Sequence, residues 1–420
     1  MVQALHQDAR VIVDRAICAV LPDEAVRRAL EGRSFSGRVV LVSVGKAGWQ
    51  MAKAASDCLG GRIDRGVVVT KYDHVKGPID KVVCFEGGHP IPDENSVRGT
   101  QAVLDAVEEL TENDTVLFLL SGGGSALFEK PFIPLAELQD VTDQLLASGA
   151  DITEINTIRK RLSTVKGGRF AKRCAPARVY SIVLSDVLGD PLDMIASGPT
   201  VPDQSTCADA QRIAEKYHLK LSARAKELLI QETPKSLDNA EAIVTGSVKE
   251  LCTAAASVCR ALGYEPLVLT DRLCCEARHA GSFLASVALS HANDGKSLAF
   301  IAGGETVVHL TGSGKGGRNQ ELALAAAEGI AGLPNVAVFS VGSDGTDGPT
   351  DAAGGYADGE TKAALASRGV RIHDVLAQND AYHALEQTDG LIVTGPTGTN
   401  VNDFAVVLIQ KQATFKYNIL

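Results

Sequence analysis

Three glycines lie between two serines in the segment Ser121–Ser125, directly after an apolar run that predicts a buried strand. Such a loop exposes successive backbone N–H groups, which can hold carboxylate or phosphate oxygens. A tight turn with a positive φ would be satisfied by one glycine, so three in a row favour a bound ligand. The loop supplies five candidate binding residues: Ser121, Gly122, Gly123, Gly124 and Ser125.

A second glycine-rich loop contains the pattern G-x-G-x-x-G at Gly312, Gly314 and Gly317. Taken literally, this pattern indicates a dinucleotide-binding turn. It lies late in the chain, however, and the strand expected before it, 306–310, is one arm of a predicted hairpin. Lys315 and Arg318 add positive charge at the start of a predicted helix, which better suits phosphate groups.

Aspartates follow two other predicted strands. Asp344, Asp347 and Asp351 alternate with glycines at a spacing that differs from the calcium-binding loop. Carboxylates beside a phosphate site would coordinate Mg²⁺ or activate a hydroxyl nucleophile, and a solvated acidic turn is the alternative. Asp186 and Asp190 follow another buried run. A carboxylate there could hold Mg²⁺ or accept a proton, although aspartate also caps helices and closes turns.

Cations gather in two places. Lys46 follows Gly45 at the end of a predicted strand, where its ammonium group could face a bound anion; a solvated lysine at a turn is an equally good interpretation. The segment EINTIRKRLSTVKGGRFAKR carries seven cations, which at helical spacing cannot all face one ligand. Most of them are expected on a solvated face, whereas Lys166 and Arg169, which flank two glycines, are expected to point into a cleft.

Several familiar catalytic patterns are missing. The sequence contains no G-x-x-x-x-G-K-[ST], no protein-kinase signature set, no H-E-x-x-H and no nucleophile elbow. The histidines His74, His89 and His309 are isolated, so we expect them to pack or to cap helices. Nine cysteines without a C-x-x-C pair predict reduced core thiols rather than a zinc site.

The elements that must position these residues alternate between short apolar runs and longer helical patterns. Predicted strands are 39–44, 66–70, 81–85, 115–120, 179–184, 242–244, 265–269, 298–302, 306–310, 336–341, 390–393 and 405–409; predicted helices include 96–110, 135–148, 319–330 and 360–367. Continuous apolar strands followed by helices are typical of parallel sheets covered on both faces. A chain of 420 residues is too long for one core. The polar stretch 232–241 predicts a boundary between domains 1–236 and 237–420.

Composition excludes several classes of protein. The net charge of −10, without a long run of one sign, gives no broad basic surface for nucleic acid. No segment reaches the roughly 20 apolar residues needed to span a bilayer, and the N-terminus lacks the apolar stretch of a signal peptide. A cytoplasmic location is expected, and a homodimer is compatible with the sequence.

Eight blocks together resemble the class II glycerate kinases, the glycerate 2-kinase family with a MOFRL-type C-terminal domain. These blocks are VGKAGWQMAKAA, GGHPIPDENS, LLSGGGSALFE, EINTIRKRLSTVKGGRFA, VLSDVLGDPLDMIASGPTVPD, GGETVVHLTGSGKGGRNQELAL, SDGTDGPTDAAGG and TGPTGTNVNDF. They run in order from about residue 39 to about residue 408. The resemblance implies an α/β fold of two Rossmann-like domains with an active-site cleft between them. It also implies phosphorylation of D-glycerate, normally at the 2-hydroxyl, with ATP and Mg²⁺.

The resemblance also implies roles for single residues. Lys46 would be the active-site lysine and Arg318 a second cation, with Asp344 and Asp351 on the acidic side of the site and Asn400 in a C-terminal loop. On this hypothesis the Ser121–Ser125 loop, with Lys166 or Arg169, holds the glycerate carboxylate. Asp351 or Asp186 orients the substrate hydroxyl. The groups expected near the nucleotide phosphates and Mg²⁺ are Lys46, Gly314, Gly316, Gly317, Arg318, Asn319, Asp344 and Asp347.

Two rival functions stay open at the level of sequence. The glycine pattern 312–317 would suit an NAD(P)-dependent hydroxypyruvate reductase, a name that members of this family have also carried. A non-catalytic protein that binds a sugar acid or a nucleotide could use the same fold.

Overall fold

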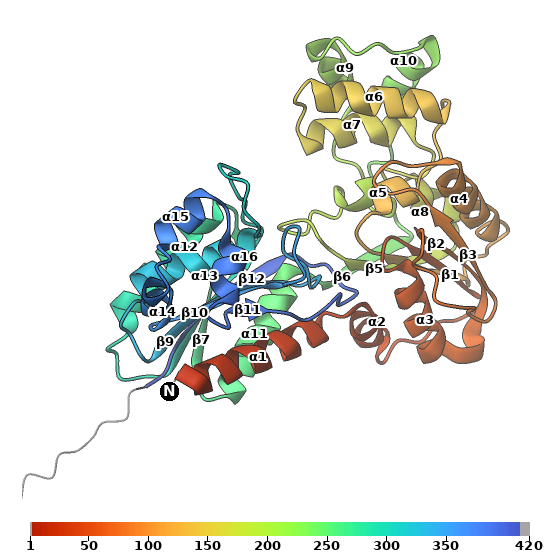
Figure 1. Ribbon diagram of the computed structural model, residues 1–420. Helices are drawn as coiled ribbons and strands as arrows, with labels where there is room; N and C mark the ends of the chain where they lie inside the picture. Colours follow the sequence, from red (N-terminus) through yellow and green to blue (C-terminus); the bar gives the residue numbers. More distant parts are fainter. Residues whose placement is uncertain (1, 412–420) are drawn as a thin grey trace, which may run out of the picture. The chain divides into compact units, whose positions relative to one another are not determined.

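The computed structural model describes residues 2–411, which form two compact α/β units (Figure 1). One unit is Pro22–Thr245, and the chain on either side of it forms the other. The division expected at residue 236 differs from this in two respects. The strand predicted at 242–244 is the half-exposed edge strand 240–246 of the first sheet rather than the first strand of the second, and the N-terminal helix belongs to the second unit.

The unit Pro22–Thr245 contains a six-stranded sheet in the order β3-β2-β1-β4-β5-β6. Its strands are β1 (Val39–Val44), β2 (Ile63–Lys71), β3 (Val82–Gly87), β4 (Thr115–Leu120), β5 (Arg178–Leu184) and β6 (Ala240–Gly246). Its helices are α2 (Pro22–Leu30), α3 (Gly48–Leu59), α4 (Glu94–Ala106), α5 (Gly124–Leu127), α6 (Leu135–Ala147), α7 (Ile152–Leu162), α8 (Arg169–Cys174), α9 (Cys207–Lys216) and α10 (Ala223–Leu229), with 3₁₀ turns at Gly60–Arg62 and Ile195–Ser197.

Strands β3, β2, β1, β4 and β5 are all parallel, as the continuous apolar runs predict. Alternate residues of β1 face opposite sides of the sheet. Val40, Val42 and Val44 pack in a core with α4, whereas the hydroxyl of Ser43 donates to the carbonyl oxygen of Gly48 in α3. Because the strands are parallel, their carboxyl ends all lie at one edge of the sheet, where open α/β sheets bind ligands.

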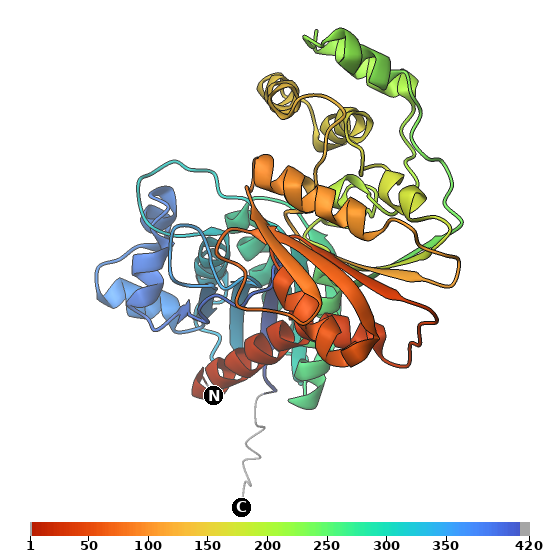
Figure 2. The same cartoon turned by 90° about the vertical axis from the view of Figure 1, so that its right-hand side faces the viewer.

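Four helices of the same unit form a separate layer with its own core (Figure 1). Helices α6, α7, α9 and α10 pack around Leu138, Leu145, Ile158 and Leu228. Figure 2 shows this group standing off the sheet of its unit. Helices α6 and α7 lie between β4 and β5 in the chain, and α9 and α10 lie between β5 and β6. The predicted helix 135–148 corresponds to α6, but the sequence pattern does not predict that these helices form a layer of their own.

The second unit contains a six-stranded sheet in the order β11-β10-β9-β12-β8-β7. Its strands are β7 (Glu265–Leu273), β8 (Leu298–Gly304), β9 (Val336–Gly342), β10 (Gly354–Asp358), β11 (Leu391–Ile392) and β12 (Asp403–Ile409). Its helices are α1 (Val2–Ala19), α11 (Val248–Ala261), α12 (Ala277–His291), α13 (Arg318–Gly329), α14 (Thr361–Ser367), α15 (Ile372–Ala377) and α16 (Ala381–Glu386).

This second sheet corrects the expectation of parallel strands. Only β7 and β8 pair in parallel, and the pairs β8–β12, β12–β9, β9–β10 and β10–β11 are antiparallel. The predicted strand 306–310 is also wrong, because within the described chain that segment forms one isolated bridge, between Val307 and Glu276. Strand β10 is not predicted, since its sequence GGYAD carries two glycines and an aspartate. The α/β class itself is confirmed.

Helix α1 packs on α11 and β9 of the second unit. Its apolar residues at Leu5, Ala9, Ile12 and Ala16 follow helical spacing and are fully or almost fully buried. The hydroxyl of Tyr264 also donates to Asp8 at 2.7 Å. None of the helices within residues 2–411 is both long enough and apolar enough to cross a membrane.

Candidate active site

The loops that follow β1 and β4 are joined at the carboxyl edge of the first sheet. The backbone N–H of Lys46 donates to the carbonyl oxygen of Gly122 at 2.8 Å, and the N–H of Ala47 donates to the hydroxyl oxygen of Ser121 at 3.0 Å. A Cβ atom on Gly45 would lie 2.3 Å from that same oxygen. The Ser121 hydroxyl therefore fixes the backbone that carries Lys46.

Each of the three glycines makes room for a different neighbour. A Cβ atom on Gly122 would lie 2.3 Å from the Oδ2 atom of Asp186, and one on Gly124 would lie 2.8 Å from the Cβ atom of Ala196. Gly123 has a φ of +86°, and a Cβ atom there would meet His89 at 2.9 Å and Lys46 at 3.2 Å. We call Lys46, His89, Asp186 and the Ser121–Ser125 loop the lysine site.

Lys166 does not face a ligand, contrary to the expectation from sequence. Its side chain is fully buried, and its ammonium group donates to the carbonyl oxygens of Ser125 at 2.9 Å and Phe128 at 3.1 Å. Burial lowers the pKa of Lys166 to about 8. The guanidinium group of Arg169 is also bound within the protein, because it donates to the carbonyl oxygen of Lys160 at 2.5 Å. Lys166 supports the Ser121–Ser125 loop from inside the protein.

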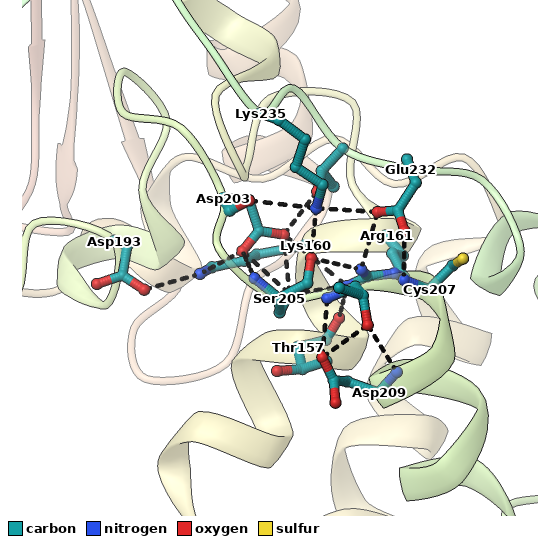
Figure 3. Close-up of polar contacts among 12 residues, drawn as sticks. Thr157, Lys160, Arg161, Asp193, Asp203, Ser205, Cys207, Asp209, Glu232 and Lys235 are labelled. Carbon is teal, nitrogen blue, oxygen red and sulfur yellow. Dashed lines mark hydrogen bonds and ion pairs between the residues drawn. The ribbon is translucent and has the colours of Figure 1, made fainter.

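The expectation that most cations of the segment EINTIRKRLSTVKGGRFAKR lie on a solvated face is also wrong. Lys160 and Arg161 are buried and share the carboxylate of Asp203 (Figure 3). The ammonium group of Lys160 lies 3.1 Å from Asp203 and 3.3 Å from Asp193, which belongs to the loop that begins at Asp186. Arg161 donates to the carbonyl and hydroxyl oxygens of Ser205 at 3.0 Å. This network ties the helical layer to the loop that carries Asp186.

In the second unit, Arg318 is held by a carboxylate that the sequence patterns do not single out. The guanidinium group donates to both carboxylate oxygens of Asp403, at 2.5 and 3.0 Å, and lies 3.1 Å from Glu305. Burial raises the pKa of Asp403 to about 6, and the neighbouring Arg318 opposes that rise. The available signal was an aspartate that opens an apolar strand, at the end of the quoted block TGPTGTNVNDF.

The three aspartates of the 344–351 segment have separate surroundings. Asp347 is buried and accepts hydrogen bonds from the backbone N–H groups of Asn319 at 3.1 Å and Gln320 at 2.9 Å, which caps α13. Asp351 accepts from the hydroxyl of Tyr382 at 2.8 Å, and this bond lowers the pKa of Asp351. Asp344 is half-buried, and its carboxylate accepts a hydrogen bond from the N–H of Thr346 at 3.0 Å.

Of these three carboxylates, Asp344 fits a Mg²⁺ site best. No group of three or more His, Cys, Asp or Glu side chains within residues 2–411 is arranged to hold a metal ion. Mg²⁺ beside a nucleotide needs only one or two carboxylates, because phosphates and waters supply its other ligands. Asp344 can serve in this way, whereas the oxygens of Asp347 are already occupied by the α13 amides.

The glycine loop 312–317 is packed against its own unit and does not present an open row of N–H groups. The N–H groups of Thr311 and Gly312 both donate to the side-chain oxygen of Asn379, and that of Gly314 donates to the carbonyl oxygen of Gln378. The N–H of Lys315 donates to Asp380 at 2.9 Å. A Cβ atom on Gly317 would lie 2.3 Å from Asp347. These glycines therefore serve close packing.

A cavity of about 630 Å³ lies beside this loop. Its lining includes Arg318, Asp344 and Glu305 as charged groups and Val307, Val308, Leu310 and Pro349 as apolar ones, together with Gly314, Gly316 and Gly317. Asn319 is buried behind it, where its side chain accepts from Ser340. Asp351 and Asn400 are not among the lining residues, and Asn400 accepts from the N–H of Asn402. We call Arg318, Asp344, Asp403 and this cavity the arginine site.

Comparison with known proteins gives two family matches. Residues 8–230 match the domain of unknown function DUF4147, and residues 298–403 match the MOFRL family. The chain is 52% identical to a D-glycerate 2-kinase of Thermotoga maritima, over 97% of this chain and 99% of that one. It is 40% identical to a glycerate 2-kinase of Pyrococcus horikoshii, over 95% and 96% of the two chains.

Solved structures are similar over the same length. The crystal structure of a glycerate kinase from Thermotoga maritima superposes with a TM-score of 0.94 at 52% identity, over 97% of this chain and all of that one. A crystal structure from Pyrococcus horikoshii gives 0.92 at 39% identity, over 97% and 99% of the chains. A relative in Agrobacterium vitis, 39% identical over 96% of this chain and 94% of its own, bears the name putative hydroxypyruvate reductase.

Proposed function

The chain belongs to the glycerate kinase family with a MOFRL C-terminal domain, and we propose that it transfers the γ-phosphoryl group of ATP to the 2-hydroxyl of D-glycerate. The observation that carries this proposal is the 52% identity to a D-glycerate 2-kinase over nearly the full length of both chains. The lysine site and the arginine site supply a chemistry that suits the reaction.

The lysine site suits the acceptor. The ammonium group of Lys46 and the Ser121–Ser125 loop bind the glycerate carboxylate, and Asp186 orients the hydroxyl group. Lys46 and Asp186 lie over neighbouring glycines of one loop, so a three-carbon hydroxy acid can reach both. Such positioning supplies much of the rate enhancement in phosphoryl transfer, because the protein forms no covalent bond to the substrate.

The arginine site suits the nucleotide. Arg318 neutralises the phosphates, the apolar residues of the 630 Å³ cavity cover the base, and Asp344 would hold Mg²⁺. The metal ion, when bound, neutralises charge on the phosphate oxygens. In-line transfer requires the acceptor hydroxyl to lie beside the γ-phosphate.

The reductase alternative rests on the glycine pattern 312–317, and two observations count against it. Strand β8 ends at Gly304, so within the described chain no strand runs directly into the pattern, and several N–H groups of the pattern are already bonded within the unit. A dinucleotide-binding turn needs both the strand and free N–H groups for the pyrophosphate.

The decisive test incubates the purified protein with ATP, Mg²⁺ and D-glycerate and identifies the product by ³¹P NMR. We expect 2-phosphoglycerate and ADP. A parallel reaction contains hydroxypyruvate and NADH, and NADH oxidation without any need for ATP would replace the kinase proposal by the reductase. In the kinase assay Lys46→Ala should lower kcat by roughly 10²-fold or more, the scale of one preorganised charge. Near-normal turnover would remove Lys46 from the site.

A further inference from the structure

His89 lies in the lysine site, although the sequence around it carries no catalytic pattern. It belongs to the segment between β3 and α4, which is pinned where α4 begins. There the carboxylate of Asp93 accepts from the N–H of Ser96 at 2.8 Å, and a Cβ atom on Gly88 would lie 3.1 Å from that carboxylate. The imidazole consequently rests on Gly123, with Nε2 3.1 Å and Cδ2 2.9 Å from the position of a Cβ atom there.

The imidazole of His89 differs from that of His74, its neighbour in the same region. The Nδ1 atom of His74 is hydrogen-bonded to the carbonyl oxygen of Lys46 at 2.8 Å, which gives that ring a structural role. Within residues 2–411, no hydrogen bond to the ring of His89 is formed. The His89 ring is partly exposed, so a substrate lying on the glycine loop can reach it.

The charges that face His89 favour its neutral form. Burial lowers the pKa of His89 below 6.5, and the cations Lys46 and Lys71 lower it further, as does His74. The nearby carboxylates are Asp93 on its own segment and Asp186 over the adjacent glycine. At neutral pH the ring therefore has a free lone pair and can accept a proton.

We propose that His89 is the proton acceptor for the hydroxyl group of the acceptor substrate, an inference that rests on the proposed kinase function. As the hydroxyl oxygen forms its bond to the γ-phosphorus, its proton moves to a ring nitrogen of His89. The bond between the γ-phosphorus and the β,γ-bridging oxygen breaks, and ADP leaves with that electron pair. The imidazolium then releases the proton to solvent after the products depart.

With this role for His89, the charged and titratable groups of the lysine site have separate functions. Lys46 binds the substrate carboxylate, and its positive charge also keeps His89 unprotonated. Asp186 orients the hydroxyl group by hydrogen bonding and needs no change of charge. A general base positioned in this way typically contributes 10²–10⁴-fold to the rate, so the proposal assigns a measurable share of catalysis to His89.

The test compares His89→Gln with wild type in steady-state kinetics from pH 5 to pH 9. Gln keeps a hydrogen-bonding group but cannot accept a proton, so kcat should fall by roughly 10²–10⁴-fold while the KM for glycerate changes only a few-fold. The acid limb of the wild-type kcat/KM profile that belongs to His89 should vanish. His218→Gln, at a position of the same unit outside the lysine site, is the matched control and should behave as wild type.

Asp186→Asn separates His89 from its carboxylate neighbour. This variant should be slower yet keep the acid limb. A limb that persists in His89→Gln and vanishes in Asp186→Asn would overturn the assignment, as would a His89→Gln variant with wild-type kcat. If His89→Gln does not fold, His89→Asn is measured with the same expectations. Wild-type protein without any ATP-dependent turnover would overturn the kinase function first, a result that no comparison of variants can mimic.

Discussion

At the scale of single residues, the chemistry of this protein depends on how each charged group is held. Arg318 is the clearest case, because Asp403 takes two of its N–H groups and fixes the plane of the guanidinium. Bidentate pairs of this kind provide geometric specificity as well as energy. The third nitrogen of the guanidinium, Nη1, lies 3.1 Å from the carboxylate of the exposed Glu305.

Asp403→Asn should therefore impair the nucleotide side of the reaction. Asn can accept only one of the two hydrogen bonds and carries no charge, so kcat/KM for ATP should fall by roughly 10²-fold, the scale of losing one preorganised electrostatic contact. The measurement is steady-state kinetics with ATP varied at saturating glycerate. Glu305→Gln removes the exposed partner of the same guanidinium and should change kcat/KM only a few-fold. Equal losses in both variants would contradict this assignment.

Sequence could identify the loops of the site but not the direction of each side chain. Lys46 and Lys166 both lie beside glycines in cation-bearing segments, yet one lines the lysine site and the other is buried under it. Asp403 opens an apolar strand at the end of the block TGPTGTNVNDF, and nothing in that block marks it as the residue that anchors Arg318. These outcomes depend on contacts between elements far apart in sequence, which no local pattern encodes.

At the scale of elements, the Ser121–Ser125 loop shows how close packing creates a site. Gly122→Ala would bring a methyl group into the carboxylate of Asp186, and Gly123→Ala would add a side chain at a positive φ against His89. Each variant should lose at least 10-fold in kcat/KM for glycerate, because misplaced catalytic groups cost about 10²-fold per ångström.

The matched control for these two variants is Gly61→Ala. Gly61 has open space where a Cβ atom would lie and no positive φ, so its replacement should leave the kinetics unchanged. Circular dichroism establishes that all three variants are folded before kinetics are compared. Wild-type kcat/KM in Gly122→Ala would show that Asp186 is not positioned by this contact.

Breaking the buried network around Asp203 should lower the free energy of unfolding more than breaking an ion pair on the surface. Lys160→Met removes one cation from a carboxylate that is itself buried, which should lower the free energy of unfolding by about 3–5 kcal/mol. Lys53→Met breaks the exposed pair with Asp57 and should change it by less than about 1 kcal/mol. Urea titration of both variants measures the difference, and similar losses would contradict the buried character of the network.

At the scale of the whole molecule, the class of fold follows from the sequence, and its strand directions follow only in part. The strands β1 and β4 have the bounds that the apolar runs predict. The strands β9 and β12 are also predicted, but their direction is not, because a strand buried on both faces has the same pattern in parallel and antiparallel sheets. The membership of α1 in the second unit is invisible in the sequence, since an amphipathic helix does not identify its partner.

That membership gives a prediction about stability. Ile12 is fully buried in the second unit, so Ile12→Ala should destabilise that unit by about 2–5 kcal/mol. Hydrogen exchange followed by mass spectrometry should show lost protection in α11 and β9 and unchanged protection in β1. Arg15→Ala, on the exposed face of the same helix, is the control. Loss of protection confined to Pro22–Thr245 would contradict the division of the chain.

The placement of α1 in the second unit has a consequence for the co-translational folding of the chain. Its apolar face is made before the Pro22–Thr245 unit, but the helix and strand on which it packs, α11 and β9, are translated only after that unit. At ordinary elongation rates that interval lasts roughly tens of seconds. During that interval the apolar face of α1 is exposed to solvent, while the Pro22–Thr245 unit can already fold. Nascent chains of this protein should therefore bind holdase chaperones through helix α1 and dissociate from them once β9 has been synthesised.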